Sequence, residues 1–408
     1  MRNREKDRAH NSKRGDNMLI RLNVKNFLSF SERENKLSHE FCMISGKTRL
    51  HNEHLLEINN IKALKFAAIF GANASGKTNL LKVLSFIKQT VTSGLPESFT
   101  KMFCRTQCAS ERQPSYFEVQ FSIGNACYSY GFEIILSKGE FISEWLVEVI
   151  GQSEHELFSR DIKSGKTKLS KKIFSSKLKM HADDILDDSS SLLITVMNKN
   201  KNHFYDDHPE ALPLFYVFNW LNSKLKILPL NKENLDLSYM FDSQKYDKIC
   251  NLLRLFDTGI TGYIINADNI MFKHGDITLP LSHESSGTIQ LLGLLEILLL
   301  DEADDITYII DNLDSGRSLH PLLTYYFVNK FLKLANKRNL QMIVTTHETI
   351  LLNFDLLRRD EIWFVDKDIE RKSHIYSLDE FNVRFDKVID KAYLEGRYGG
   401  IPIFEKEM

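Results

Sequence analysis

Residues 71–78 carry the sequence Gly-Ala-Asn-Ala-Ser-Gly-Lys-Thr, and this stretch decides the fold. Two other Gly-Lys-Thr triplets, which begin at Gly46 and Gly165, lack the further glycine five positions earlier. The full spacing is that of a phosphate-binding loop, whose glycines let backbone N–H groups converge on phosphate oxygens. A short apolar run at 65–70 precedes the loop, and apolar residues at helical spacing follow from 79 to 91. The context is therefore strand, loop and helix.

This loop supplies the residues expected to hold a nucleoside triphosphate. Lys77 would reach the β- and γ-phosphates, and the Thr78 hydroxyl would bind Mg²⁺. The helix that begins near Lys77 would direct its positive N-terminal end at the phosphates. We therefore expect ATP and Mg²⁺ as cofactors. The other residues expected to contact the nucleotide are Gly71, Asn73, Ser75, Gly76 and Asn79.

A phosphate-loop ATPase also needs an acidic residue at the end of a neighbouring strand to hold the magnesium ion. Two apolar runs end in an acid, one at Asp301 and the other at Asp311. The run before Asp301 is leucine-rich and continues a helical pattern, whereas residues 306–310 are short and β-branched. We therefore assign Asp311 to this role. The next residue, Asn312, cannot act as a general base, and Asp314 is a nearby carboxylate that could substitute.

The order of the later motifs resembles that of ABC-type ATPases of the SMC, Rad and RecF kind. Residues 284–288 (Glu-Ser-Ser-Gly-Thr) form a serine–glycine turn, and Thr345-Thr346-His347 closes a strand after Asp311. Finer motifs resemble the AAA-labelled bacterial ABC ATPases of abortive-infection and anti-phage systems, such as the Rlo-type and PARIS ATPase components. These motifs are Asn-Phe-Leu-Ser-Phe at 26–30, Ser-Glu-Trp-Leu at 143–146, Asp-Thr-Gly-Ile at 257–260, Ser-Leu-His-Pro at 318–321 and Gly-Arg-Tyr-Gly-Gly-Ile-Pro at 396–402.

The resemblance implies that two ATPase heads hold ATP between them. The phosphate loop of one head would face Ser285 and Gly287 of the other, and Ser285 would contact the γ-phosphate at a helix start. His347 would sense this phosphate as a switch histidine, and Gln113 is a candidate for the glutamine that links Mg²⁺ to the head. The implied catalytic positions are Lys77, Asn312 and His347, and the implied metal positions are Thr78, Asp311 and Gln113. Because an asparagine replaces the expected glutamate, ATP hydrolysis is expected to be slow or absent.

The pattern of elements predicts an α/β fold. Helices and strands alternate after residue 281, which indicates a parallel sheet with crossover helices, and residues 115–150 predict a three-stranded antiparallel meander. We expect an ABC-type phosphate-loop NTPase head with a mixed sheet, an antiparallel β subdomain and an inserted, mostly helical region. The expected parts are a basic disordered tail (1–17), the first half of the head (18–150), the lysine-rich and helical insertion (151–265) and the second half of the head (266–408).

Composition and charge limit the partners. The 408 residues are 43% apolar and 26% charged, as in soluble globular proteins, and the formal charge is −1. Residues 161–180 nevertheless contain seven lysines and one aspartate, so the lysines from Lys163 to Lys179 either bind DNA or form a solvated hairpin. The longest apolar run, 291–300, is too short to span a bilayer, and the five cysteines do not suggest a disulfide scaffold. We expect a cytoplasmic protein without a membrane partner.

Two functions compete. In the first, the chain is an ATP-gated scaffold or sensor of anti-phage defence, which forms a homodimer or higher oligomer and controls a separate effector, a nuclease or toxin. The roughly 60 residues after His347 leave no room for an appended nuclease domain of ordinary size. In the second, the chain is an SMC- or RecF-like ATPase that binds DNA ends or acts in DNA repair. A transporter ATPase is a weaker third possibility because it would need a membrane partner.

Overall fold

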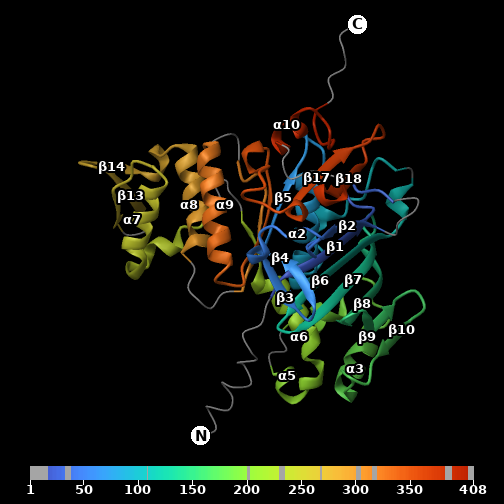
Figure 1. Ribbon diagram of the computed structural model, residues 1–408. Coiled ribbons are helices and arrows are strands. Elements are labelled where there is room, and N and C mark those ends of the chain that lie inside the picture. Colours follow the sequence, from blue (N-terminus) through green and yellow to red (C-terminus); the bar gives the residue numbers. More distant parts are fainter. Residues whose placement is uncertain are drawn as a thin grey trace.

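Two large sheets and a smaller lobe make up the protein, which Figure 1 shows as a computed structural model. The structure describes residues 17–32, 38–107, 109–199, 203–228, 235–266, 269–299, 305–314, 319–381 and 388–402. The basic tail expected at 1–17 lies outside these residues except for Asn17. Within the described ranges, no helix combines the length and the apolar character needed to cross a membrane.

The central sheet is mixed, as expected. Its six strands, in spatial order, are β11 (Leu225–Leu228), β15 (Thr307–Ile310), β16 (Gln341–Thr345), β5 (Phe66–Phe70), β17 (Ile362–Lys367) and β18 (Ser373–Ser377). Neighbouring strands are parallel from β11 to β17, and only β18 is antiparallel to its neighbour. The carboxyl ends of five strands therefore meet at one edge of the sheet.

Helices cover both faces of this sheet. As a result, β5, β15 and β16 are buried along their whole length. On one face Ala67 and Ile69 pack with α2 (Lys77–Ser93). On the other, Phe66, Ala68 and Phe70 share a core with α8 (Ser286–Leu298) and α9 (Pro321–Ala335). Alternate residues of β5 thus point to opposite cores, as the pleat of a strand requires. These helices confirm the predicted order of helix and strand.

The second sheet is antiparallel and lies on the far side of α2. Its seven strands, in spatial order, are β10 (Lys166–Leu169), β9 (Ser153–Asp161), β8 (Glu140–Ile150), β7 (Ala126–Ile135), β6 (Ser115–Ile123), β1 (Leu19–Lys25) and β2 (His39–Cys42). The ring of Phe86 on α2 lies 4.5 Å from that of Phe117 on β6 and 5.3 Å from that of Phe27. Helix α2 is therefore held between the two sheets.

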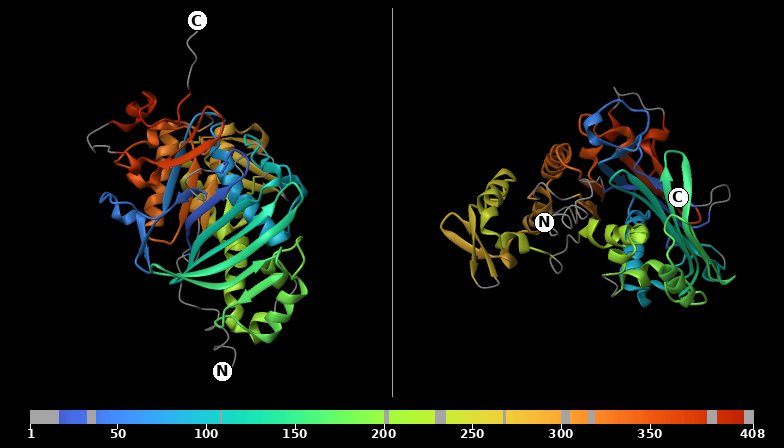
Figure 2. Two further views of the ribbon diagram at one scale, coloured as in Figure 1. Left: turned by 90° about the vertical axis from the view of Figure 1, so that its right-hand side faces the viewer. Right: turned by 90° about the horizontal axis from the view of Figure 1, so that it is seen from below.

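The smaller lobe consists mainly of α7 (Tyr246–Leu255) and a three-stranded sheet, and Figure 2 shows it extending to one side of the two large sheets. Its strands are β12 (Gly262–Asn266), β13 (Asn269–His274) and β14 (Ile277–Pro280). The remaining elements are β3 (Leu55–Ile58), β4 (Ile61–Leu64), α3 (Ser176–Asp184), α4 (Leu193–Asn198), α5 (Phe204–Asp207), α6 (Leu212–Asn219) and α10 (Ile389–Leu394).

The region 151–265 differs from the expected helical insertion. Its described residues contain five α-helices, but β9 and β10 extend the meander to five strands, β11 joins the central sheet, and β12 pairs with β13 across the expected boundary. The sequence conceals these strands for a physical reason. The first four residues of β9 are exposed and polar, and β11 is only four residues long, so neither has a readable hydrophobic period.

One buried amide joins both sheets. Gln341, at the start of β16, accepts hydrogen bonds from the Leu19 N–H (2.8 Å) and the Thr307 hydroxyl (3.1 Å). Its own amide donates to the carbonyls of Leu19 (3.0 Å) and Leu64 (2.8 Å). The side chain is fully buried, so every one of its polar atoms is satisfied by the protein.

We predict that Gln341→Leu lowers the free energy of unfolding by about 2–5 kcal/mol, because it leaves buried polar groups without partners. Urea unfolding followed by circular dichroism measures this change. Gln89→Leu is the matched control, since Gln89 is exposed on α2, and it should cost less than about 0.5 kcal/mol. Equal losses in the two variants would contradict the role of Gln341.

Candidate nucleotide-binding site

The predicted site residues converge at the carboxyl ends of the parallel strands. Gly71 follows β5, Asp311 follows β15, and His347 lies two residues after β16. Ligands of open α/β sheets bind at this edge, since the loops after parallel strands open a crevice there. The fold therefore places the phosphate loop, Asp311 and His347 at the same edge of the sheet.

Close packing explains the two glycines of the loop. A Cβ atom on Gly71 would collide with the backbone carbonyl of Val365 in β17, and one on Gly76 would collide with the Ser373 hydroxyl. Gly76 also has a φ of 115°, in the region that favours glycine, directly before α2 begins at Lys77. The loop thus lies against β17 and β18, and only glycine fits at these two positions.

Thr78 and Asp311, the two residues expected to hold Mg²⁺, are in direct contact. The Thr78 hydroxyl donates to Asp311 Oδ1 at 3.1 Å, and the Thr345 hydroxyl donates to the same oxygen at 2.6 Å. Thr345 in turn accepts the N–H of Asn312 at 2.7 Å. A hydroxyl and a carboxylate side by side are the hard oxygen ligands that Mg²⁺ prefers. The donor set therefore fits the ion that the loop implies.

The loop also has groups suited to a triphosphate. Lys77 is 5% exposed, and its ammonium donates to the carbonyls of Gly71 (2.9 Å) and Ala72 (3.1 Å). Burial lowers the pKa of Lys77 to about 8, although the charges of Asp314 and Asp311 oppose the shift. Among the residues that the structure describes, the buried Ser75 hydroxyl has no hydrogen-bond partner. A buried cation and an unsatisfied hydroxyl fit a phosphate group.

Asp314 is the carboxylate that faces this lysine. It is 5% exposed, and both of its oxygens accept the N–H of His347 at 3.2 Å. Asn312 lies between Asp311 and Asp314 with a φ of 53°, in the left-handed region. Sequence reasoning left the role of Asp314 open and missed Thr345. Asp314 lies three residues after Asp311, and Thr345 lies two residues before His347. Their closeness to these motifs in the sequence is the one feature that could have pointed to them.

Three predicted positions, Ser285, Gly287 and Gln113, have no hydrogen bond or ion pair to the phosphate loop among the residues that the structure describes. Ser285 is exposed and caps α8 by accepting the Thr288 N–H at 3.1 Å. Gln113 has an exposed side chain, and its backbone is held by the Asn26 amide, which donates to its carbonyl at 3.0 Å, and by the Ser110 carbonyl, which accepts its N–H at 3.2 Å. Asn73 is exposed in the loop.

Ser29 of the motif at 26–30 is hydrogen-bonded to Asn79, directly after the phosphate loop, and to Ser373, which contacts the loop. Asn79 Nδ2 donates to the Ser29 hydroxyl at 2.8 Å, so this side chain points at the motif. Ser373 on β18 donates to Ser75 O and contacts Ser29 Oγ, both at 2.6 Å. These bonds fix the phosphate loop to two distant segments of the chain.

The fold and the site together define an ATP-binding phosphate-loop ATPase. Residues 66–353 match the protein family described as "AAA domain, putative AbiEii toxin, Type IV TA system". The match spans well over half of the chain, and the chain belongs to this family. It is thus an AAA/ABC-like ATPase of the abortive-infection type. No curated protein matches the chain.

We predict that ATP affinity falls by up to about tenfold per pH unit above pH 8. The free protein loses the Lys77 proton near that pH, whereas bound phosphates raise the pKa again, so binding must take up a proton. Titration of a fluorescent ATP analogue between about pH 7 and pH 9.5 measures the slope.

Lys77→Arg is the control for this slope, because a guanidinium stays protonated over the whole range. Its affinity should be independent of pH. A wild-type profile that is flat, or an arginine profile that falls equally, would contradict the assignment to Lys77.

Proposed function

We propose that the protein is an ATP-gated switch of an abortive-infection system. ATP and Mg²⁺ join two copies of the chain, and the joined state controls a separate effector protein, a nuclease or toxin. Lys77 neutralises the phosphates, Thr78 and Asp311 hold the metal ion, and His347 responds to the terminal phosphate.

The observation that carries this proposal is a site split into two separate halves. The phosphate loop and Asp311 are in contact, but the serine–glycine turn that should complete the site begins a different helix. Ser285 is exposed at the start of α8, which is 13 residues long, and the N-terminus of a helix attracts phosphate. A two-fold related copy would present this turn to the loop, as most homodimers are built on such an axis.

Slow hydrolysis would make the joined state long-lived. Asn312 lacks a basic group, and Asp314, the remaining carboxylate, accepts the His347 N–H and faces Lys77. An Asp314 carboxylate held in this way polarises an attacking water less well than a free glutamate at position 312. Gln113 would reach the metal only after its exposed side chain turned toward the site.

We predict that ATP with Mg²⁺ converts the wild-type chain from monomer to dimer, with little ADP released. Ser285→Arg should bind ATP but stay monomeric, since the bulky cation lies in the interface. Asn312→Glu should raise ATP turnover by about 10²-fold because it restores a general base. Light scattering after size exclusion and an ADP assay measure the two effects.

Ser176→Arg is the matched control, because Ser176 is an exposed serine at the start of α3. It should dimerise as the wild type does. Dimerisation by Ser285→Arg, or rapid turnover by the wild type, would refute the switch.

Control of a separate effector is tested by isolating the tagged chain from its native host. A stoichiometric nuclease or toxin should accompany the wild type and not Ser285→Arg.

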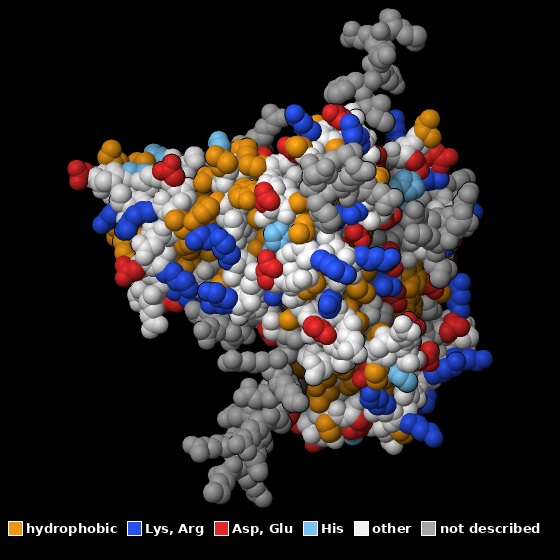
Figure 3. Space-filling model, viewed as in Figure 1, with side chains coloured by type: hydrophobic (Ala, Val, Ile, Leu, Met, Phe, Trp, Pro, Cys, Tyr) orange, Lys and Arg blue, Asp and Glu red, His pale blue; other side chains and the backbone are white. Residues whose placement is uncertain are grey.

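DNA binding is the alternative function, and one observation favours it. The lysines at 163, 166, 168 and 171 are exposed on and beside the β9–β10 hairpin. Other lysines of this segment are engaged: Lys172 pairs with Glu148, and Lys179 pairs with Asp183. Figure 3 shows Lys and Arg side chains at the right-hand edge of the molecule, over the β9–β10 region of Figure 1. Such a row suits a phosphate backbone.

We predict that, under this alternative, the chain binds duplex DNA at low salt and loses affinity as salt rises. Replacing the four exposed lysines by alanine should reduce the slope of log affinity against log salt by up to about 0.9 per lysine. The control replaces four exposed lysines elsewhere, Lys47, Lys62, Lys333 and Lys337. Fluorescence anisotropy measures both, and equal slopes in the two variants would exclude a role for the hairpin.

A further inference from the structure

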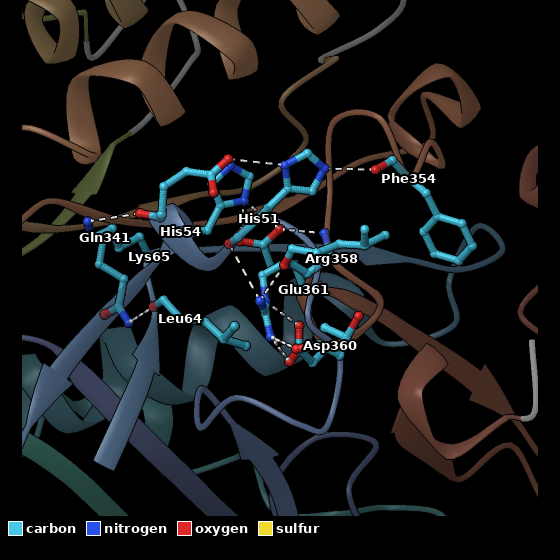
Figure 4. A network of polar contacts seen from close by, with 12 residues as sticks. His51, His54, Leu64, Lys65, Gln341, Phe354, Arg358, Asp360 and Glu361 are labelled. Carbon is cyan, nitrogen blue, oxygen red and sulfur yellow. Dashed lines mark hydrogen bonds and ion pairs between the residues drawn. The ribbon is translucent and has the colours of Figure 1, made fainter. Parts of the chain in front are cut away.

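The opposite edge of the central sheet carries a second polar cluster. His51, Glu53 and His54 lie in the turn before β3, and Glu361 directly precedes β17. This is the amino-terminal edge of the parallel strands, whereas the phosphate loop lies at the carboxyl edge. Figure 4 shows the side chains of the cluster converging from these two segments. The nucleotide site uses none of them.

Hydrogen bonds to the Phe354 carbonyl and the Glu361 carboxylate determine which ring nitrogen of each histidine carries the proton. His51 Nε2 lies 2.8 Å from the Phe354 carbonyl, which can only accept, so this nitrogen carries the proton. His54 Nδ1 lies 3.1 Å from both oxygens of the Glu361 carboxylate and is a donor for the same reason. In the neutral rings the lone pairs are therefore on His51 Nδ1 and His54 Nε2. Metal-binding histidines are almost always held by a carboxylate or carbonyl in this way.

A carboxylate faces one of these lone pairs. Glu53 Oε1 lies 3.2 Å from His51 Nδ1, so two acceptors point at each other when the ring is neutral. A cation held between the two groups would relieve this repulsion, as would a second proton on the ring. One nitrogen of each histidine and one oxygen of Glu53 lie within 4.8 Å of one another.

The turn that carries the ligands is anchored firmly. Glu361 is fully buried and accepts the Arg358 N–H at 2.8 Å, which holds the carboxylate behind His54. The buried guanidinium of Arg358 donates to the carbonyls of Leu50 and Thr48 (3.1 Å to the latter) and to Asp360. The segment leading to His51 is thus tied to the segment before β17, as Figure 4 shows for Arg358, Asp360 and Glu361.

We propose that His51 Nδ1, Glu53 and His54 Nε2 bind a zinc ion, with water in the fourth position. Two imidazoles and one carboxylate are a donor set typical of Zn²⁺ with an open coordination position. Ligands about 2.1 Å from zinc in a tetrahedron lie about 3.4 Å apart, so ligand atoms that are up to 4.8 Å apart must approach one another by up to about 1.4 Å on loading. The side chains of His51 and Glu53 are 23% and 53% exposed, which lets them make this movement. The histidine rings stack 4.9 Å apart, and His51 must turn out of that stack.

The test titrates zinc chloride into the full chain after removal of metals with EDTA, without nucleotide and in competition with a chromogenic chelator. One zinc ion per chain should bind, and Co²⁺ in its place should give the visible absorption of a tetrahedral site. His51→Gln and Glu53→Gln should each weaken zinc binding by at least about tenfold. Both side chains are partly exposed, so these variants are expected to fold, and thermal unfolding checks that they do.

His203→Gln is the matched control, since His203 lies 3.4 Å from Asp206 on the surface without an acceptor behind the ring among the described residues. It should bind zinc as tightly as the wild type. Glu361→Gln should weaken binding about 10–100-fold if the carboxylate orients His54. Absence of zinc binding, or equal binding by wild type and the His51→Gln/Glu53→Gln double variant, would overturn the proposal and leave an ordinary histidine–glutamate ion pair. ATP binding is an independent readout of the nucleotide site, so either site can fail separately.

Discussion

One carboxylate oxygen holds the nucleotide site together. Asp311 Oδ1 accepts hydrogen bonds from Thr78 at the start of α2 and from Thr345 at the end of β16, so a single atom links three elements. This geometry requires β15, β16 and β5 to be parallel and to end at the same edge. A slip of one residue in β15 would turn Asp311 away from the loop, because side chains alternate between the faces of a strand. Full burial of these strands makes such a slip costly.

The same parallel order separates the two polar clusters of the molecule. The phosphate loop and His347 lie where strands end, and His51, Glu53 and Glu361 lie where strands begin. The chain between β16 and β17 runs from one edge to the other. It starts near His347 and supplies the Phe354 carbonyl behind His51. This crossover connection therefore contributes residues to both edges of the sheet. Parallel strands that lie side by side always require a connection that returns from one edge to the other.

Local patterns predicted the residues that act within one segment. The glycine spacing identified the loop, and β-branched residues distinguished Asp311 from Asp301, which lies outside the described residues. Contacts between distant segments were not predictable. The hydrogen bonds that join Asn79 to Ser29, Thr345 to Asp311 and Asp314 to His347 depend on packing, and the nucleotide contact of Asn79 stays a prediction. The strands β9 and β11 were also missed, because polar or four-residue strands show no clear alternation.

The sequence by itself determined that the chain has a phosphate loop, an aspartate directly after a short β-branched run, and no glutamate at position 312. These features depend on residue type and spacing over a few positions, which the chain carries whatever its tertiary structure. Only the tertiary structure decided which groups surround Lys77, which lone pairs His51 and His54 present, and that the Ser285 hydroxyl caps α8. Those outcomes depend on contacts between residues tens to hundreds of positions apart, and the order and register of the strands set them.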